Sequence, residues 1–252
     1  MTSKRALLQK FLKGIETGSA MAAAVVNENK YIQHNPQTRE GGDGIAALFA
    51  RLSKTNPKVT FMRVFEDGDF AFAHNVYDFA NVKVAFEVFR FEDGQAVEHW
   101  DNIQPIAGPN SAGRSMVDGV CEITDLDKTE AYRALVQDFT NKVLIGRQLD
   151  RLLDYVSDDL IQHDAETGDG AVSLRSLLEP LGEAAPVRHY ETLHRVLAEG
   201  NFVLCMSEGA KNSVHSGIYD LFRIDEGLIV EHWNTVEAIP PLSERKNDNG
   251  KF

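Results

Sequence analysis

The sequence predicts an α+β protein in which one fold is built twice in tandem. First, the stretch 88–101 returns as 221–234 with seven of its fourteen residues unchanged, which indicates an internal duplication. Second, each half begins with helical patterns and continues with strand patterns, an order typical of an α+β domain. Third, a segment rich in glycine, proline and polar residues, 105–125, separates the halves. We therefore predict a first domain over residues 1–110, a linker over 111–126 and a second domain over 127–252.

The first half predicts three helices, a short extended piece and a meander of four strands. Apolar residues recur at helical spacing over residues 3–17, behind Thr2 and Ser3 as candidate caps. A second helix is expected around 19–26, then an extended piece at 30–36 that ends at a proline, and a third helix over 44–53 that Asp43 caps. Four strands are expected, over 59–65, 70–77, 82–91 and 96–104.

The second half repeats this order. A capping box from Asp127 to Glu130 predicts a helix over 131–145, and a second helix is expected over 149–156. The motif Leu-Ile-Gln-His-Asp at 160–164 matches Tyr-Ile-Gln-His-Asn at 31–35, and a Gly-Asp-Gly follows each. A third helix is expected to run to residue 181. The remaining elements are strands over 187–197, 201–208, 215–224 and 228–236, and a polar tail, 243–252, that is expected to be loose or to pack late.

Composition limits the classes of function. The 252 residues are 43% hydrophobic and 9% aromatic, which is enough for a core in each half. The formal net charge of -12 argues against a nucleic-acid surface or an anionic membrane as partner. Cys121 and Cys205 form neither a disulfide framework nor a zinc-binding spacing, and Cys205 lies in an apolar run where we expect a buried, inert thiol. No signal-peptide core or membrane-spanning run is visible, so we expect a cytoplasmic protein.

The repeated stretch predicts a β-hairpin whose turn is an acidic pair followed by glycine. Because side chains alternate between the two faces of a strand, His99 and Asp101 share one face with two aliphatic residues, opposite Glu98 and Trp100. In the preceding strand Glu87 lies on the same face as two phenylalanines. A histidine and carboxylates among apolar side chains suit the wall of a small-molecule pocket.

With these motifs in this order, each half resembles the SnoaL-like branch of the nuclear transport factor 2-like superfamily, which has the cystatin-like fold. Residues 31–36 with the following Gly-Asp-Gly, residues 88–104 and the middle segment 113–130 carry the likeness, which covers essentially the whole chain. It implies two cone-shaped domains, each with about three helices on a strongly curved antiparallel sheet around a pocket, paired as an intrachain pseudo-dimer. It also implies polyketide-cyclase or ketosteroid-isomerase chemistry, but many members have no known activity and fold alone does not settle function.

The resemblance implies a general acid/base carboxylate in the late strands, and we match that position to Glu87 and its counterpart Asp220. A carboxylate among apolar side chains loses hydration, so its pKa rises and it can move a proton alpha to a carbonyl without a cofactor. The alternative is a carboxylate that pairs with Arg90 or Arg223, or that faces solvent. The catalytic candidates are Glu87, His99, Asp101, His34, Asp220 and His232.

The two halves do not keep the same set, because Asp101 becomes Asn234. We therefore expect different chemistry in the two pockets and prefer the first half. The ligand-binding candidates are His74, Tyr77, Phe89, His163, Phe222 and Asn234. His34 and His163 are either pocket acid/bases or structural residues that tie a loop to the sheet.

Two further features remain open. Trp100 and Trp233 are expected to pack on the opposite face of their strands, at a contact between the halves. His34, His99 and Asp101 are of ligand types that bind zinc or iron, but nothing in their spacing fixes a geometry, so we expect no metal and no cofactor.

These features predict a small-molecule pocket protein that acts as a cofactor-free cyclase or isomerase on a small hydrophobic carbonyl compound. The alternative is a non-catalytic ligand-binding or assembly module of the same fold. We expect neither nucleic acid nor membrane as partner, and we expect the two halves to pair within the chain, with further homo-oligomers left open.

Overall fold

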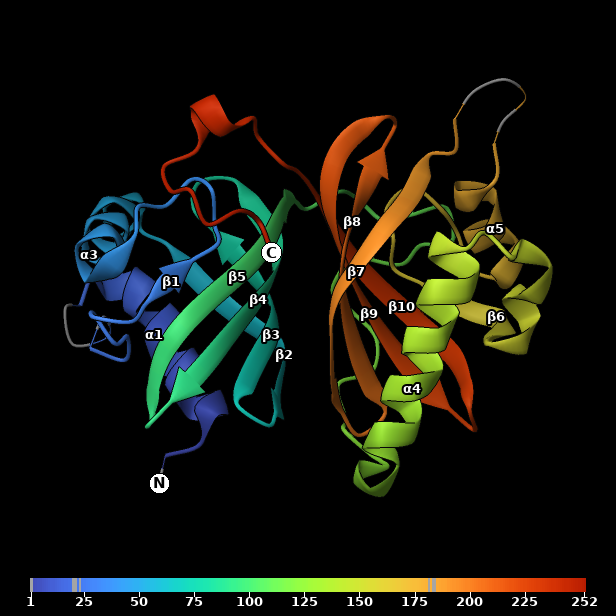
Figure 1. Ribbon diagram of the computed structural model, residues 1–252, viewed down its shortest axis with the longest axis horizontal. Coiled ribbons are helices and arrows are strands. Elements are labelled where there is room, and N and C mark those ends of the chain that lie inside the picture. Colours follow the sequence, from blue (N-terminus) through green and yellow to red (C-terminus); the bar gives the residue numbers. More distant parts are fainter. Residues whose placement is uncertain (1, 20–21, 23, 181, 183–184) are drawn as a thin grey trace. The chain divides into compact units, whose positions relative to one another are not determined.

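The computed structural model describes residues 2–19, 22, 24–180, 182 and 185–252, which form two compact units (Figure 1). Unit 1 comprises the chain up to Ile106 together with Ile239–Phe252, and unit 2 comprises Ala107–Ala238. These bounds differ from the predicted domains in two respects. The segment predicted to be a linker belongs to unit 2, and the tail predicted to belong to the second domain belongs to unit 1.

Unit 1 joins helices to one five-stranded sheet. Helix α1 (Lys4–Thr17) follows Ser3, whose Oγ accepts a hydrogen bond from the Ala6 N–H, so the predicted cap is present. The other elements are β1 (Ile32–Gln33), α3 (Gly41–Leu52), a 3-10 turn (Ser53–Thr55), β2 (Lys58–Asp67), β3 (Phe70–Asp78), β4 (Val82–Glu92) and β5 (Gln95–Pro105). The sheet order is β1-β5-β4-β3-β2, with β1 parallel to β5 and the other pairs antiparallel. Of the helix predicted around 19–26, residues 20, 21 and 23 lie outside the described residues, whereas Ala24 and Val25 form a turn and Val26 an isolated bridge to Ala96.

Unit 2 has the same sheet order, β6-β10-β9-β8-β7, again with its first pair parallel. Its elements are a 3-10 turn (Leu126–Lys128), α4 (Thr129–Phe139), a π-helical turn (Thr140–Ile145), a 3-10 turn (Leu149–Asp154), β6 (Val156–Gln162), α5 (Ala171–Leu178), β7 (Arg188–Glu199), β8 (Phe202–Lys211), β9 (Val214–Asp225), β10 (Leu228–Ala238) and a final 3-10 turn (Leu242–Glu244), which lies in the tail of unit 1. Both units are therefore α+β. The pairing of the two units as a pseudo-dimer stays a prediction.

Several predicted boundaries differ from the structure. The helix predicted over 131–145 changes to a π-helical turn after Phe139, and the helix predicted over 149–156 is a 3-10 turn. Helix α5 ends at Leu178, before Pro180, because the residue before a proline disfavours helix. Asp43 lies in the first turn of α3 rather than at its cap, and Lys128 rather than Asp127 precedes α4.

Each unit has its own core between a long helix and one face of its sheet (Figure 1). In unit 1, Phe11 of α1 packs at 5.0 Å from Phe49 of α3 and at 5.2 Å from Phe89 of β4, measured between ring centroids. In unit 2, Phe139 of α4 packs edge-on against Phe222 of β9 at 5.7 Å. Burial of each such side chain stabilises its unit by about 1.5–3 kcal/mol.

The two segments that follow the last strand of each sheet carry the same motif, Asn-x-x-Gly followed by a basic residue, at 110–114 and 247–251. We name residues 107–119 the linker strap and residues 239–252 the tail strap. The side-chain amide of Asn110 donates to the carbonyls of Gln162 and Asp164, at 2.6 and 3.2 Å. That of Asn247 donates to the carbonyls of Asn35 and Thr38, at 2.7 and 2.9 Å.

Each strap therefore closes the unit that did not supply its preceding strand. The tail strap follows β10 of unit 2 but packs on unit 1. Of the two alternatives predicted for the tail, loose or packed, the structure has the packed one, held by the buried amide of Asn247. The linker strap follows β5 of unit 1 but packs on unit 2.

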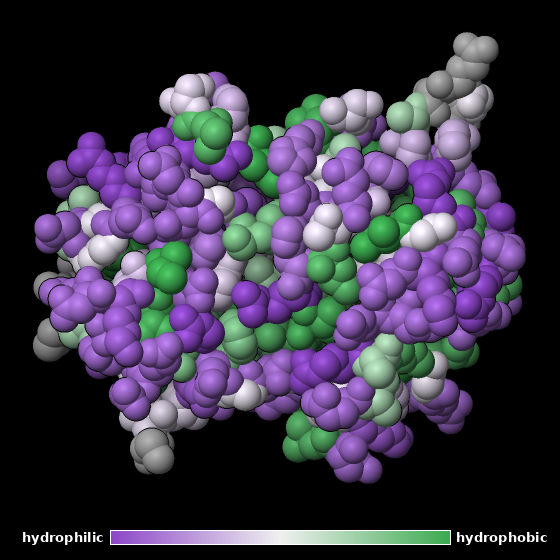
Figure 2. Space-filling view, viewed as in Figure 1, coloured by the Kyte–Doolittle hydropathy of each residue, from purple (hydrophilic) through white to green (hydrophobic). Residues whose placement is uncertain are grey.

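Hydrophilic residues cover most of the face seen in Figure 2, as the net charge leads one to expect. Within the described part of the chain, no helix has the length and apolar character needed to span a membrane.

Candidate functional site

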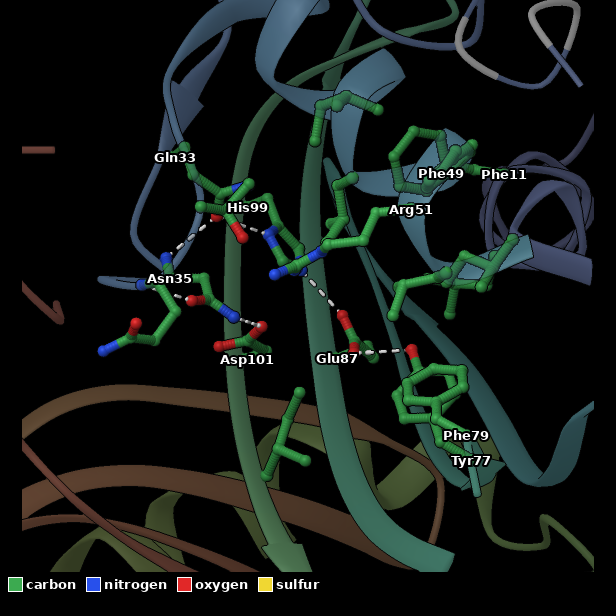
Figure 3. A pocket seen from close by; sticks show the side chains of 18 of the residues that line it. Phe11, Gln33, Asn35, Phe49, Arg51, Tyr77, Phe79, Glu87, His99 and Asp101 are labelled. Atoms are coloured by element: carbon green, nitrogen blue, oxygen red, sulfur yellow. Dashed lines mark hydrogen bonds and ion pairs between the residues drawn. The ribbon is translucent and has the colours of Figure 1, made fainter. Parts of the chain in front are cut away.

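The candidate site is a pocket in unit 1, between α1, α3 and the sheet (Figure 3). Its cavity volume is about 170 Å³ and it is partly open to solvent, so it is smaller than the pockets of about 300–1,000 Å³ that hold drug-sized ligands and suits a small compound. Its apolar lining consists of Phe11, Leu12, Ile15, Ile45, Leu48, Phe49, Leu52, Phe79 and Ile103. The sheet contributes the polar wall, because alternate residues of β3, β4 and β5 point to this face.

A chain of four polar side chains forms that wall. The Tyr77 hydroxyl donates to Glu87 Oε1 at 2.6 Å, and Glu87 Oε2 lies 2.6 Å from His99 Nε2. His99 Nδ1 lies 2.8 Å from Gln33 Oε1. Tyr77, Glu87, His99 and Gln33 are all buried, yet all four line the pocket.

The hydrogen-bond directions place one proton between Glu87 and His99. Gln33 Oε1 also accepts the backbone N–H of Asn35, so this atom is the acceptor and His99 Nδ1 carries a hydrogen. The contact between His99 Nε2 and Glu87 Oε2 then requires a proton on one of the two atoms. Either Glu87 is a carboxylic acid beside a neutral imidazole, or it is a carboxylate beside an imidazolium. The pair therefore holds a mobile proton at the pocket wall.

Burial raises the pKa of Glu87 above its ordinary value, and the charge of nearby Asp101 raises it further. The hydrogen bonds from His99 and Tyr77 oppose this effect without cancelling it. The pKa of the Tyr77 hydroxyl is raised well above its usual range by burial and by the adjacent Glu87. Tyr77 is therefore a proton donor at neutral pH, and Glu87 is held closer to neutrality than an exposed glutamate.

Asp101 forms the second polar group of the pocket. Its Oδ2 accepts a hydrogen bond from the Asn35 side-chain amide at 2.5 Å, and its Oδ1 lies 3.6 Å from Lys251 Nζ of the tail strap. Both Asp101 and Lys251 are buried. The tail strap thus brings a cation from the far end of the chain to a carboxylate of this site.

Glu87, His99 and Asp101 each offer one ligand atom, and these atoms all lie within 4.8 Å of one another. This is a different trio from the one considered in the sequence, because Glu87 replaces His34. Imidazole and carboxylate ligands suit zinc or iron. However, Glu87 and His99 are hydrogen-bonded to each other, and Lys251 Nζ already lies 3.6 Å from Asp101 Oδ1, so the geometry is equally that of a proton-sharing cluster beside an ion pair.

His34, a predicted catalytic residue, lies outside the pocket lining. Its ring stacks on Trp100 with centroids 4.9 Å apart, and its Nε2 lies 3.1 Å from Glu98, which in turn accepts a 2.8 Å hydrogen bond from Arg90 Nε. Its Nδ1 lies 3.2 Å from the Gly250 carbonyl of the tail strap. Burial lowers the pKa of His34, so the ring ties the strap and loop to the sheet rather than facing the cavity.

His163 occupies the same position in unit 2. It stacks on Trp233 at 4.7 Å and lies 2.9 Å from Glu231, which accepts a 2.7 Å hydrogen bond from Arg223. The Trp233 indole N–H donates to the Asp118 carbonyl at 2.8 Å. This repeated histidine–glutamate–arginine group accounts for the acid that follows Val97 and Val230 in both halves. It also shows that the structural alternative applies to His34 and His163.

His74 was expected to share the cavity with Tyr77, but the two lie on opposite faces of β3. His74 stacks on Phe86 at 4.6 Å and contacts Arg63 at 3.2 Å. The difference follows from strand alternation, since residues separated by three positions point to opposite faces. Phe89 lies beneath the site in the core, 4.4 Å from the His99 ring, and does not line the pocket.

Unit 2 keeps the chain of four polar groups but rebuilds one end of it. His232 Nε2 lies 2.9 Å from Asp220, and His232 Nδ1 lies 2.7 Å from Gln162 Oε1. The hydroxyl on the carboxylate now comes from Tyr190 of β7, at 3.2 Å. Strands β2 and β3 of unit 1 correspond to β7 and β8 of unit 2. In unit 1 the tyrosine is Tyr77 on β3, opposite Val59 of β2. In unit 2 it is Tyr190 on β7, opposite Gly209 of β8. The tyrosine has moved to the neighbouring strand while its hydrogen bond is kept.

The change from Asp101 to Asn234 is compensated in the same way. In unit 1 the amide is Asn35 and the acid is Asp101, whereas in unit 2 the amide Asn234 donates to the acid Asp164 at 2.6 Å. The buried guanidinium of Arg188 lies 3.0 Å from Asp164. Unit 2 therefore keeps a buried carboxylate but neutralises it with its own arginine.

Asp220 and His232 are buried, and neither lines any of five well-formed pockets among the described residues. Phe222 stacks on His232 at 4.7 Å and packs against Phe139. The predicted second-half residues are all buried: His163, Asp220, Phe222, His232 and Asn234. The preference for the first half as the catalytic one stays a prediction.

Several polar residues that line the unit 1 pocket were not predicted from the sequence: Gln33, Asn35, Gln37, Thr38, Arg51 and Lys83. The first two were quoted only as parts of the repeated Ile-Gln-His motif. Their signal was available, because the Gln is kept in both halves and Asn35 changes to Asp164 as Asp101 changes to Asn234. Because the amide and the acid exchange places together between the halves, the two positions are expected to be in contact.

Comparison with known proteins gives the following matches. Residues 133–232 match the SnoaL-like domain family. No curated protein matches the chain. Among solved structures, TsrD from Streptomyces laurentii is similar at 20% identity over 41% of this chain and 92% of that one, with a TM-score of 0.35. A candidate polyketide cyclase from Bacillus cereus is similar at 18% identity over 39% and 72%, with a TM-score of 0.36.

An epoxide hydrolase from M. tuberculosis that is described as LEH-like is similar at 17% identity over 40% of this chain and 81% of that one, with a TM-score of 0.35. Because these identities and TM-scores are low, the activities of the three proteins are not transferred to this chain. The family match concerns the second half: residues 133–232, within unit 2, match the SnoaL-like domain family.

Proposed function

We propose that unit 1 is a cofactor-free acid–base enzyme that moves a proton alpha to the carbonyl group of a small hydrophobic compound, as a cyclase or isomerase. Unit 2 is then a non-catalytic copy. The observation that carries this proposal is Glu87: a buried carboxylate with a raised pKa, hydrogen-bonded to Tyr77 and His99, on the wall of an open apolar pocket.

The proposed chemistry needs only groups present at the site. Glu87, as carboxylate, takes the proton from the carbon alpha to the carbonyl, and the electron pair moves to the carbonyl oxygen as an enolate. Each carboxylate oxygen has a second lone pair, so Glu87 can accept this proton while Tyr77 and His99 hold it in place. In an isomerase the proton returns at another carbon. In a cyclase the enolate carbon attacks a second carbonyl, whose oxygen takes a proton from the Glu87–His99 pair.

The test is hydrogen–deuterium exchange alpha to the carbonyl of a hydrophobic ketone, followed by NMR, for Glu87→Gln and its matched control Asp220→Asn. Glu87→Gln is expected to lower the exchange rate by about a hundredfold or more, because the amide cannot accept the proton. Asp220→Asn is expected to leave the rate within about twofold. Equal rates for wild type and Glu87→Gln would show that Glu87 is not the base.

The same reaction has a predictable pH dependence. The base is active when ionised, so the rate rises with pH through the pKa of Glu87. Because burial raises that pKa, the midpoint of the acid limb is expected above 4.5, the ordinary value for glutamate. A midpoint at or below 4.5 would contradict the assigned role.

A second reading, a non-catalytic ligand-binding or assembly module, is favoured by one observation. Unit 2 keeps the same hydrogen-bonded series of tyrosine, carboxylate, histidine and glutamine, and there all four residues are buried and line none of the five pockets described above, which supports a structural use of the series. On this reading Glu87→Gln and Asp220→Asn both destabilise the protein, and neither changes exchange. Trp100→Ala and Trp233→Ala would then lower stability and leave ligand affinity unchanged.

A further inference from the structure

Four cations lie around the opening of the unit 1 pocket. Arg51 and Lys83 line the pocket itself. Arg51 also lines a second, adjoining pocket, together with Arg39 and Lys246 of the tail strap. The two pockets share Gln37, Thr38, Leu48 and Arg51, so they adjoin along α3. Figure 3 shows the Arg51 side chain extending from α3 toward the polar end of the pocket.

These cations form no ion pair with the two acids that line the first pocket. Glu87 contacts Tyr77 and His99, and Asp101 contacts Asn35 and Lys251. Among the described residues, no carboxylate forms an ion pair with Arg39, Arg51, Lys83 or Lys246, and no acid is among the residues that line the second pocket. The nearest acid of the loop, Glu40, is hydrogen-bonded to the Asn249 side chain. In a chain of net charge -12, four unpaired cations at one opening form a local positive potential.

The duplication provides an internal control for this cluster. From the repeated motifs, Arg51 corresponds to Leu177, Lys83 to Ser216 and Lys246 to Pro109, and the Arg39–Glu40 step has no counterpart before Gly168. Leu177 and Ser216 are buried in unit 2. Three of the four cations therefore have a counterpart position in unit 2, and an uncharged residue stands at each of these positions. A cation cluster that the common fold required would be expected at the corresponding positions of both units.

From this arrangement we infer that the opening of the unit 1 pocket is an anion-binding subsite, and that the substrate is a hydrophobic carbonyl compound that carries a carboxylate or phosphate group. The apolar lining holds the hydrophobic part, the Glu87–His99 wall meets the carbonyl end, and Arg51 with Lys83 holds the anionic end. That the ligand is a substrate rests on the proposed function. That the pocket binds an anionic ligand does not depend on the proposed function.

The test uses a matched pair of fluorescent ligands, 1-anilinonaphthalene-8-sulfonate and the neutral N-phenyl-1-naphthylamine, which share their rings and differ in the sulfonate. The wild type is expected to bind the anionic ligand more tightly, and only that binding is expected to weaken as salt is raised. Arg51→Gln and Lys83→Gln are each expected to weaken the anionic ligand about threefold, and the double variant about tenfold, with the neutral ligand unchanged.

The control is Lys54→Gln, because Lys54 is an exposed cation close to the end of α3 that lines neither pocket. It is expected to leave both affinities unchanged. Equal weakening of the two ligands by Arg51→Gln and Lys83→Gln, or an effect of Lys54→Gln as large as theirs, would overturn the subsite.

Competition against the bound fluorescent ligand identifies the anion. The compounds are 3-benzoylpropionate, its methyl ester and phenyl phosphate. Displacement by either anion at concentrations at which the ester is ineffective supports the inference, and the better competitor tells carboxylate from phosphate. Displacement by the ester alone contradicts it. If the anions bind but Glu87→Gln leaves proton exchange unchanged, the subsite stands and the proposed enzymatic function fails.

Discussion

Unit 1 and unit 2 are two copies of one scaffold, and they differ in the surroundings of the polar side chains on their sheets. Both keep a chain of tyrosine, carboxylate, histidine and glutamine. In unit 1 this chain lines an open apolar pocket surrounded by unpaired cations. In unit 2 the corresponding interior is packed, and its carboxylate Asp164 is neutralised by Arg188. The difference separates the hydrogen-bonded side chains, which both units keep, from the unit 1 pocket and its cations, on which the proposed function depends.

Two exchanges make this separation visible. The tyrosine moves to the adjacent strand, and the acid and amide at positions 35 and 101 trade places at 164 and 234. Both exchanges preserve a contact and not a residue. A comparison of aligned positions alone suggests that unit 2 has lost an acid, whereas the structure shows that it has moved it.

The largest effect on stability is expected from Arg188→Gln. It leaves the buried carboxylate of Asp164 without its cation, and an unpaired buried charge costs about 3–5 kcal/mol of unfolding free energy. The chain has one tryptophan in each unit, so urea denaturation followed by fluorescence in a Trp100→Phe background reports on unit 2 through Trp233. The control is Arg175→Gln, which breaks an exposed ion pair with Glu179 in the same unit and is expected to cost about 0–1 kcal/mol. Equal losses would refute the buried-charge argument.

This loss has a defined pH dependence. Burial alone would raise the pKa of Asp164, but Arg188 and the hydrogen bonds from Glu166 N–H and Asn234 outweigh it, so the pKa is lowered. A lowered folded-state pKa contributes stability above the unfolded value of about 3.9, and that contribution is lost as pH falls through the folded value. The stability difference between wild type and Arg188→Gln should therefore shrink as pH falls below about 4.

An intermediate effect is expected from the two straps. Asn247→Ala removes a side chain that satisfies two carbonyls of unit 1, and Asn110→Ala does the same in unit 2. Each is expected to cost about 1–3 kcal/mol, because buried carbonyls lose their partners. The effect of Asn247→Ala should appear in the transition of Trp100, although residue 247 follows the last strand of unit 2. If Asn247→Ala shifts only the Trp233 transition, the exchange of straps is wrong.

The smallest effect on stability is expected from thiol modification. Burial raises the pKa of Cys205 to about 12, so at pH 8 it has roughly a thousandfold less thiolate than an ordinary cysteine. Cys121 is exposed. Iodoacetamide on the folded protein should modify Cys121 alone, with a melting temperature changed by no more than about 1 °C, as mass spectrometry and calorimetry would show. Modification of both thiols at similar rates would contradict the packed interior of unit 2.

Much of the fold was predictable because strand signals are local. The repeated hairpin, the acidic-glycine turns and the alternation of apolar residues depend on neighbours two to four positions apart. The helical segments were harder. Residues 140–145 and 149–154 carry apolar helical spacing, but packing against the sheet turns them into π-helical and 3-10 segments. Intrinsic propensity is weak compared with tertiary packing.

The candidate site was predictable in part for the same reason. Alternation along β4 and β5 places Glu87, His99 and Asp101 on one face, and the structure has them there, lining the pocket. His34 and His74 were predicted to face the pocket but do not line it. The short motif around His34 does not determine which face of the sheet the side chain contacts, and His74 lies on the face of β3 opposite Tyr77. Lys251 could not have been foreseen beside Asp101, since 150 positions separate them and no local pattern joins them.

By itself, the sequence determined that one α+β scaffold occurs twice, and that each copy carries a carboxylate and a histidine on one strand face opposite a tryptophan. These features follow from identity between the halves and from the two-residue period of a strand. Only the tertiary structure decided which copy has an open pocket, which residues surround it with positive charge, and that each strap closes the other unit. Those properties depend on contacts between residues distant in the chain, and such contacts exist only once the chain has folded.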